Sequence, residues 1–353
     1  MSKNPDSREL KYTILKNELM AYIKKEKLEN GDKLLTVREI MKKYRASQAT
    51  VTRTFELLES ENIIERHHGD GIYLKSLKKN EILSIGVILP DSENTYFNSF
   101  LNQLFYCKEN NLININIKIS ANDYSRERQA ADELIKQGIQ GLIIIFEPGL
   151  ANLKYFEKID AARFPVISIS RNLQNSRLNY IVPDNYQAGV LAAEYLLSQS
   201  CTSLLYLGNK KMRKIDERFT GFRDTLQKKG HDFSGKNFFL SESGNSFTDG
   251  YNAFRRAMNR AGRIDGLMAF HDIYAAGAYK FCYQNGIKVP GQIKIIGCDN
   301  LSFTEFFSPG ITTIDYNIRL MAESALKMLL AKIKGEKISS IVLPVKLIKR
   351  ETA

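Results

Sequence analysis

The 353-residue sequence contains no tryptophan, only four histidines and only four cysteines. The cysteines are far apart, and no Cys-x-x-Cys or Cys/His spacing indicates a metal site or a redox pair. The longest apolar run, near GLIIIF, is too short to span a bilayer, and MSKNPDSREL at the start contains no apolar core of a signal peptide. These absences predict a soluble, cytoplasmic protein with buried free thiols, no metal, no other cofactor and no membrane partner.

Sequence signatures of common enzymes are also missing. No Gly-x-Gly-x-x-Gly follows a predicted strand, and no phosphate-binding loop or Gly-x-Ser-x-Gly elbow occurs. His271-Asp272 resembles a metal-hydrolase dipeptide, but no other histidine completes a site. The remaining histidines are His67, His68 and His231. We therefore expect no enzymatic activity.

Positive charge is in excess, with 51 Lys and Arg against 39 Asp and Glu. The net charge of +12 favours a polyanionic partner such as nucleic acid. Residues 1–78 hold 16 of the basic side chains and 12 of the acidic ones, so the excess is spread along the chain. Charge alone therefore does not locate a DNA-binding site.

The most specific pattern lies in residues 36–73, TVREIMKKYRASQATVTRTFELLESENIIERHHGDGIY. Before it, an apolar face with three-to-four spacing predicts a helix from about residue 8 to 27. Thr36, in a capping box with Glu39, begins a second helix, and Ser47 begins a third. Strands predicted at 63–66 and 72–75 flank a glycine-containing turn. This order predicts a winged helix-turn-helix, which places one helix in the DNA major groove.

After the basic segment at 75–81, β-branched apolar runs alternate with amphipathic helical stretches such as 125–137, 186–198, 217–229 and 273–285. Strands are predicted at 82–89, 113–119, 141–146, 166–169, 203–207, 237–240, 266–270 and 293–297. The alternation predicts parallel sheets with right-handed crossovers. Two sets of four units predict two doubly wound lobes, with a ligand cleft at the carboxyl ends of their strands.

The first segment resembles the winged-helix domain of the gluconate-repressor (GntR) family, in the stretches GDKLLTVREIMKKY, SQATVTRTFELLESENII and HHGDGIYL. The resemblance implies that the wing tip, His68 and Gly69, enters the minor groove. Gln48 stands where the family usually has arginine. Because Gln suits adenine and Arg suits guanine, we expect an operator that differs from the family's common core. The DNA-contacting side chains expected on the helices are Thr36, Arg38, Ser47, Gln48, Thr50 and Arg53.

Residues 81–352 resemble the effector domain of the lactose/galactose-repressor family, which shares the fold of periplasmic sugar-binding proteins. The matching stretches include IGVILPDSENTYF, VPDNYQAGVLAAEYLL, ERFTGFRDTL and IDGLMAFHDIYAAGAYKFCYQNGIKVPGQIKIIGCDN. The pairing of the two domains resembles the arabinose-repressor type of regulator. It implies an α/β chain with a winged helix-turn-helix at 1–76, a linker at 77–82 and a two-lobed periplasmic-binding-protein-like domain at 83–353. We expect lobe 1 to contain 83–181 and 316–336, and lobe 2 to contain 182–315 and 337–353.

The same resemblance implies an effector site at the strand ends. Arg218 matches an arginine whose guanidinium holds sugar hydroxyls, and Asp299 matches a carboxylate that accepts from two of them. His271 stands where the family often has Asn, and a role in buttressing the cleft is its alternative. The further ligand-binding candidates are Asp91, Phe97, Glu147, Arg171 and Phe247.

The sequence therefore predicts a DNA-binding transcription regulator, expected as a homodimer on a palindromic double-stranded operator. By resemblance, the default is a repressor of carbohydrate-utilisation genes that a small neutral sugar, of the pentose or deoxyhexose class, releases from DNA. A sugar-dependent activator is the alternative within this class. A stand-alone sugar-binding protein and a sugar-active enzyme are alternatives from other classes, which a gel shift and a turnover assay distinguish.

Overall fold

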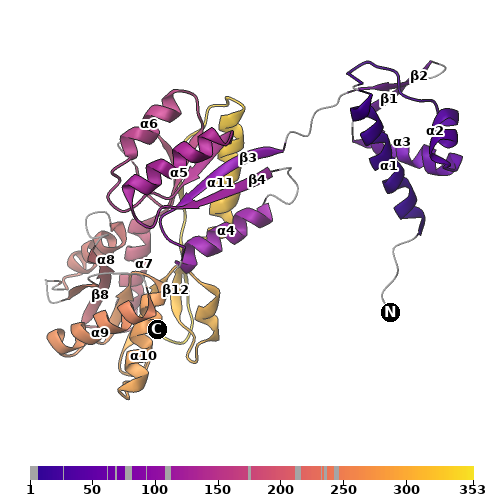
Figure 1. Ribbon diagram of the computed structural model, residues 1–353. Coiled ribbons are helices and arrows are strands. Elements are labelled where there is room, and N and C mark those ends of the chain that lie inside the picture. Colours follow the sequence, from indigo (N-terminus) through magenta and orange to yellow (C-terminus); the bar gives the residue numbers. More distant parts are fainter. Residues whose placement is uncertain are drawn as a thin grey trace. The chain divides into compact units, whose positions relative to one another are not determined.

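The computed structural model divides into two compact units, Met1–Ile82 and Leu83–Ala353. Figure 1 shows both units with their helices and strands. The structure describes residues 7–26, 28–61, 63–67, 70–75, 82–92, 94–107, 113–173, 176–210, 216–231, 233, 237–241 and 246–353. Within these residues, no helix combines the length and the apolar character that a membrane crossing requires.

The first unit is the predicted winged helix-turn-helix. Its elements are α1 (Ser7–Lys25), α2 (Val37–Tyr44), α3 (Gln48–Ser60) and the antiparallel pair β1 (Ile64–His67) and β2 (Gly71–Leu74). Thr36 and Glu39 form the predicted capping box, and the Ser47 hydroxyl accepts from the amide of Thr50. These caps set where α2 and α3 begin. One apolar core joins the three helices to the wing, and includes Leu15, Leu19, Ile23, Ile40, Val51, Phe55, Leu58, Ile64 and Leu74.

The second unit contains two six-stranded sheets, one in each lobe. The lobe 1 sheet has the order β13-β7-β6-β5-β3-β4, and all its neighbours are parallel. Its strands are β3 (Leu83–Leu89), β4 (Ile113–Ile119), β5 (Gly141–Ile144), β6 (Val166–Ile169), β7 (Asn179–Pro183) and β13 (Ile341–Leu343). Every residue of β5 and β6 is buried, as expected for parallel strands covered on both faces.

The lobe 2 sheet has the order β14-β12-β11-β10-β8-β9, and β14 alone runs antiparallel to its neighbour. Its strands are β8 (Leu204–Asn209), β9 (Phe238–Ser241), β10 (Gly266–Ala269), β11 (Lys294–Cys298), β12 (Thr312–Asp315) and β14 (Lys346–Ile348). The two sheets confirm the predicted doubly wound α/β architecture.

Helices flank both sheets (Figure 1). Lobe 1 has α4 (Thr95–Cys107), α5 (Tyr124–Lys136), α6 (Leu153–Ala161) and α11 (Ile318–Ile333). Lobe 2 has α7 (Asn185–Ser198), α8 (Glu217–Lys228), α9 (Phe247–Ala261) and α10 (Asp272–Gln284), together with a 3-10 turn at Ser302–Phe306. The chain crosses between the lobes three times, after β7, β12 and β13, so each lobe is assembled from segments far apart in sequence.

The structure differs from the expected lobe limits at two places. β7 continues in the lobe 1 sheet to Pro183, although lobe 2 was expected from residue 182. β13 pairs with β7 in lobe 1, although residues 337–353 were expected in lobe 2. β7, β12, β13 and β14 are also absent from the predicted strands. β13 and β14 have three residues each, which is too short for a periodic pattern.

Candidate functional site

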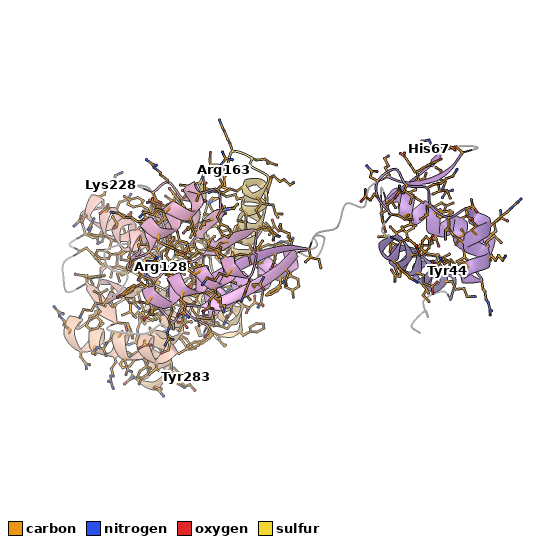
Figure 2. The ribbon with its side chains drawn as sticks, turned by 45° about the horizontal axis from the view of Figure 1, so that its top comes forward. Tyr44, His67, Arg128, Arg163, Lys228 and Tyr283 are labelled. Atoms are coloured by element: carbon orange, nitrogen blue, oxygen red, sulfur yellow. The ribbon has the colours of Figure 1, made fainter. Side chains whose placement is uncertain are left out.

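The DNA-facing candidates of the first unit lie on α2 and α3. Arg38, Gln48 and Arg53 are all exposed. Between the helices, Tyr44 ends α2 (Figure 2) and Arg45 adopts the left-handed conformation with a φ of 50°. This turn brings α3 away from α2 so that Gln48, in the first turn of α3, lies on the surface that a recognition helix presents.

Three of the predicted DNA contacts take part in helix caps. The Thr36 hydroxyl donates to the Glu39 carboxylate at 2.8 Å. The Ser47 and Thr50 hydroxyl oxygens lie 2.8 Å apart, and Thr50 is half-buried. These side chains define the start of their helices, and their contact with DNA stays a prediction.

Arg53 donates to Glu56 at 2.8 Å, and the two side chains are 66% and 49% exposed. Exposed pairs of this kind contribute little to stability, so Arg53 can exchange Glu56 for a phosphate at low cost. His68 and Gly69, the predicted wing tip, lie outside the described residues. His67, at the end of β1 (Figure 2), has its Nε2 2.9 Å from a carboxylate oxygen of Glu65.

Arg218 is the central charged group of a buried polar cluster in lobe 2. It lies in the first turn of α8 and is 7% exposed. Its Nε donates to Asp216, and its Nη1 donates to the Phe270 carbonyl and the Tyr316 hydroxyl, each at 3.1 Å. Burial acts to lower the pKa of Arg218, but the influence of Tyr316 and Asp216 outweighs it and raises that pKa. The guanidinium is therefore charged and fixed in orientation.

Two glycines hold α8 against α7. A Cβ at Gly189 would overlap the Arg218 carbonyl, and a Cβ at Gly221 would overlap the Tyr186 carbonyl. Glycine therefore permits a close helix contact at these positions. The contact fixes the backbone position of Arg218.

Asp216 supports Arg218 from within the lobe 2 core. It is 6% exposed, and its second oxygen accepts from the Tyr206 hydroxyl at 2.6 Å. A buried ion pair of this kind is costly to break, because removing one partner leaves the other charge uncompensated.

His271 and Asp299 lie side by side where β10 and β11 end. His271 Nδ1 is 2.9 Å from Asp299 Oδ2. Burial, reinforced by the charges of Arg218 and Arg171, lowers the pKa of His271 well below 6.5, so the ring is neutral. Burial raises the pKa of Asp299, and Arg218 opposes that rise. Asp299 has a φ of 112°, a conformation that is costly for a residue with a Cβ and is typical of functional sites.

In lobe 1, Ser170 and Arg171 follow the end of β6. The Nε of Arg171 donates to the Phe146 carbonyl at 3.3 Å. The Tyr96 hydroxyl is 2.7 Å from the Ser170 hydroxyl. The Tyr96 ring meets the Tyr316 ring edge-on, with 6.5 Å between their centres. Contacts through Tyr96 and Tyr316 thus connect Ser170 of lobe 1 to Arg218 of lobe 2.

The other predicted ligand contacts lie in different surroundings. Phe97 is 7% exposed and packs in the lobe core beside Tyr96. Glu147 is buried, and its carboxylate accepts from the amides of the loop that follows it. Phe247 is 46% exposed at the start of α9 and packs on Phe303. Asp91 is half-buried after β3.

Four residues around Arg218 and Arg171 were not predicted from the sequence as site residues. Asp216, Tyr96 and Tyr316 all lie within or beside the stretches that resemble the effector domain, and Ser170 precedes the predicted Arg171. Asp216 stands two residues before Arg218, which is a detectable signal for a partner. Tyr316 comes from a strand end about 100 residues away, and its hydrogen bond to Arg218 has no local signature.

The described residues contain no group of three His, Cys, Asp or Glu side chains arranged to hold a metal ion. The four cysteines are free thiols, and Cys201, Cys282 and Cys298 are buried. A winged helix joined to a two-lobed α/β domain with a buried charged cluster near its strand ends is the architecture of a ligand-responsive transcription regulator.

Comparisons with known proteins agree with this class. Residues 11–74 match the gntR family of bacterial regulatory proteins, and residues 193–353 match the periplasmic binding protein-like domain. The transcriptional repressor PurR of Vibrio parahaemolyticus is 25% identical over 325 residues, covering 90% of this chain and 93% of that protein. The ribose operon repressor of Halalkalibacterium halodurans is 21% identical over 334 residues, covering 90% and 97%.

A solved LacI-family regulator from Enterococcus faecium with bound ribose has a TM-score of 0.66 and 22% identity, over 76% of this chain and 98% of its own. The chain is thus a transcription regulator that joins a gntR-type DNA-binding domain to a periplasmic-binding-protein-like domain. Its relatives are regulators rather than enzymes.

Proposed function

We propose that a monosaccharide bound between the lobes of the second unit controls operator binding by the winged helix. The observation that carries this proposal is the pair of buried groups formed by Arg218, in the first turn of α8, and Asp299, directly after β11. Both are held by protein hydrogen bonds, and Tyr96 of lobe 1 contacts the same cluster. Fixed, charged hydrogen-bonding groups suit a ligand rich in hydroxyls. The ribose seen in the E. faecium regulator supports a sugar as the effector class.

Regulation requires a difference in ligand affinity between two states of the receptor. A ligand that closes the lobes can change DNA affinity only by its differential affinity for the closed and open states. Such couplings are typically about 1–3 kcal/mol. The chain acts, in this proposal, as a repressor of carbohydrate-utilisation genes that the ligand releases, in line with the repressors among its relatives.

On the DNA side, Gln48 meets base edges in the major groove, and Arg38 and Arg53 contact phosphates. Their exposure on α2 and α3 supports these roles. Thr36, Ser47 and Thr50 add contacts from the helix starts, where backbone amides favour a phosphate. His68 and Gly69 serve as the wing tip in the minor groove.

The functional form in this proposal is a homodimer, whose symmetry matches a palindromic operator. A hollow of about 600 Å³ on lobe 2 is lined by Phe247, Tyr251, Tyr279, Tyr283 and Phe307, among others. Tyr283 is 71% exposed and lies at the end of α10 (Figure 2). An exposed aromatic surface marks an interface, and a second copy is the partner that symmetric DNA reading requires. Tyr283→Glu should shift the protein toward monomer in light scattering, and an unchanged dimer would exclude this face.

The decisive experiment combines a thermal-shift screen with operator binding. The full-length protein is screened against a panel of monosaccharides, starting with the pentoses and deoxyhexoses that the sequence favours. A compound that raises the melting temperature is then added to protein bound to selected operator DNA. Release of DNA supports the repressor, and tighter binding supports the activator. A panel without any stabilising sugar contradicts the proposal.

A further inference from the structure

A direct side-chain hydrogen bond joins the two lobes of the effector unit. Asn172 lies in lobe 1, shortly after the end of β6, and Glu217 is the first residue of α8 in lobe 2. The Nδ2 group of Asn172 donates to a carboxylate oxygen of Glu217 at 2.7 Å. Both residues are half-buried, so the bond is partly shielded from water. A hydrogen bond to a carboxylate is stronger than one between neutral groups, and partial shielding strengthens it further.

The two ends of this bond belong to parts of the protein that can move relative to each other. Glu217 is fixed to lobe 2 through α8, which packs closely on α7. Asn172 belongs to the segment of lobe 1 between β6 and β7. The lobes are joined by three crossings of the chain, and such connections allow domains to hinge. A side-chain bond between the lobes opposes that movement.

The Asn172 amide is satisfied on one side only. An ionised carboxylate accepts hydrogen bonds and cannot donate, so Glu217 requires the amide nitrogen to face it. The Oδ1 atom of Asn172 is buried and has no hydrogen-bond partner within the described residues. A buried acceptor without a partner is unfavourable, and separation of the lobes would expose it to water. The bond to Glu217 and the burial of Oδ1 therefore act in opposite directions, so the contact can be made and broken.

We propose that Asn172 and Glu217 form a latch between the lobes, which favours the lobe arrangement seen in the structure and opens when the lobes separate. The proposal rests on the proposed function, because the latch acts on the site between the lobes and sets how readily that site binds its ligand. A ligand that contacts both lobes binds more tightly when the lobes are already held together. Its apparent affinity falls in proportion to the fraction of molecules whose lobes are joined.

The test breaks the latch and then restores it with reversed polarity. Asn172→Asp places two carboxylates against each other and should drive the lobes apart. Adding Glu217→Gln supplies an amide donor to the new carboxylate, so the double variant should restore the contact. Spin labels at Lys158→Cys of α6 and Lys228→Cys of α8 report the separation of the lobes in the sugar-free, full-length protein (Figure 2). Both lysines are exposed, and a Cys107→Ser background removes the cysteine that is not buried.

We expect Asn172→Asp to lengthen the mean distance between the labels and the double variant to return it to the wild-type value. Asn122→Asp is the matched control, because it makes the same change at an exposed position of lobe 1, and it should leave the distance unchanged. An unchanged distance in Asn172→Asp overturns the latch. A double variant with the same lengthened distance as Asn172→Asp overturns it as well, since a general loss of structure is not repaired by Glu217→Gln.

Calorimetry with D-ribose as the probe links the latch to the site between the lobes. Asn172→Asp should weaken binding of D-ribose by roughly 10-fold, as expected when the loss of a hydrogen bond to a charged group lowers the fraction of joined lobes. The double variant should recover most of that affinity. Equal affinities of wild type and Asn172→Asp contradict the role of the latch in ligand binding. If neither D-ribose nor any other sugar of the panel binds the wild type, the proposed function fails, while the label distances still decide whether the latch exists.

Discussion

The two units place charged side chains in opposite environments. In the DNA-binding unit, the side chains of the Arg53–Glu56 pair are 66% and 49% exposed, whereas in the effector unit those of the Arg218–Asp216 pair are 9% and 3% exposed. An exposed pair is weak and easily exchanged for another partner, while a buried pair is fixed by the fold. In the proposed function, DNA contacts therefore depend on exposed side chains that can move to a phosphate, whereas effector contacts depend on buried side chains that the fold holds in place.

The buried pair gives the largest expected effect. Arg218→Met leaves Asp216 buried without its cation, and should lower the free energy of unfolding of the effector unit by about 3–5 kcal/mol. It should also abolish the response of operator binding to sugar. Arg223→Met is the matched control, because Arg223 pairs with Asp224 at the surface of the same helix. Denaturant unfolding of both variants measures the difference, and equal losses would contradict the distinction between buried and exposed pairs.

Gln48→Arg tests the DNA-binding unit, because it changes an exposed side chain proposed to contact a base and disturbs no buried pair. Its position in the first turn of α3 predicts a shift from adenine to guanine at one symmetric position of each half-site. A good bidentate contact discriminates by about 1–3 kcal/mol, which selection of binding sites from a random pool detects. The stability of the protein should not change. Identical selected sites for wild type and variant would place base reading elsewhere on α3 or the wing.

Arg53→Ala should change the salt dependence of DNA binding rather than its sequence preference. If Arg53 contacts one phosphate, the log–log slope of affinity against salt concentration flattens by roughly one unit. Arg126→Ala, which removes an exposed arginine of the effector unit, should leave the slope unchanged. Filter binding at several salt concentrations measures both. A loss of operator affinity at constant slope would indicate that Arg53 reads a base.

The smallest expected effect is on how the free energy of unfolding depends on pH through His271. Because the folded-state pKa of His271 lies below its ordinary value of 6.5, the unfolded chain binds a proton first as pH falls. Wild type should therefore lose stability relative to His271→Gln as the pH drops below 6.5, and the difference should level off above it. Unfolding free energies of the two proteins from pH 5 to 8 test this. A difference independent of pH would mean that folding does not lower the pKa of the His271 ring.

How much the sequence could predict depends on whether a contact is local or long-range along the chain. Thr36 and Ser47 each bond to the residue three positions further on, so the capping pattern predicted both helix starts correctly. The alternation of apolar runs predicted the two lobes. Arg218 and Asp299 were predicted as site residues only through the resemblance of their motifs, and their ligand contacts stay predictions.

The contacts that organise the cleft are long-range. Tyr316 reaches Arg218 across 98 positions of sequence, and Tyr96 reaches Ser170 across 74. The position of Glu147 after a strand indicates the cleft, yet its carboxylate caps its own loop. Periodicity describes neighbours along the chain and carries no information about such pairings. β13 and β14 were not predicted because their three residues each are too few for a periodic pattern.

The central claim, that a ligand in the cleft controls DNA binding, is tested most directly by operator affinity with and without a sugar that calorimetry shows to bind. The wild-type protein should change its affinity for operator DNA by about 5- to 150-fold at saturating sugar. Asp299→Asn should bind operator DNA normally and fail to respond. If the bound sugar leaves the wild-type operator affinity unchanged, the cleft does not regulate DNA binding and the account is contradicted.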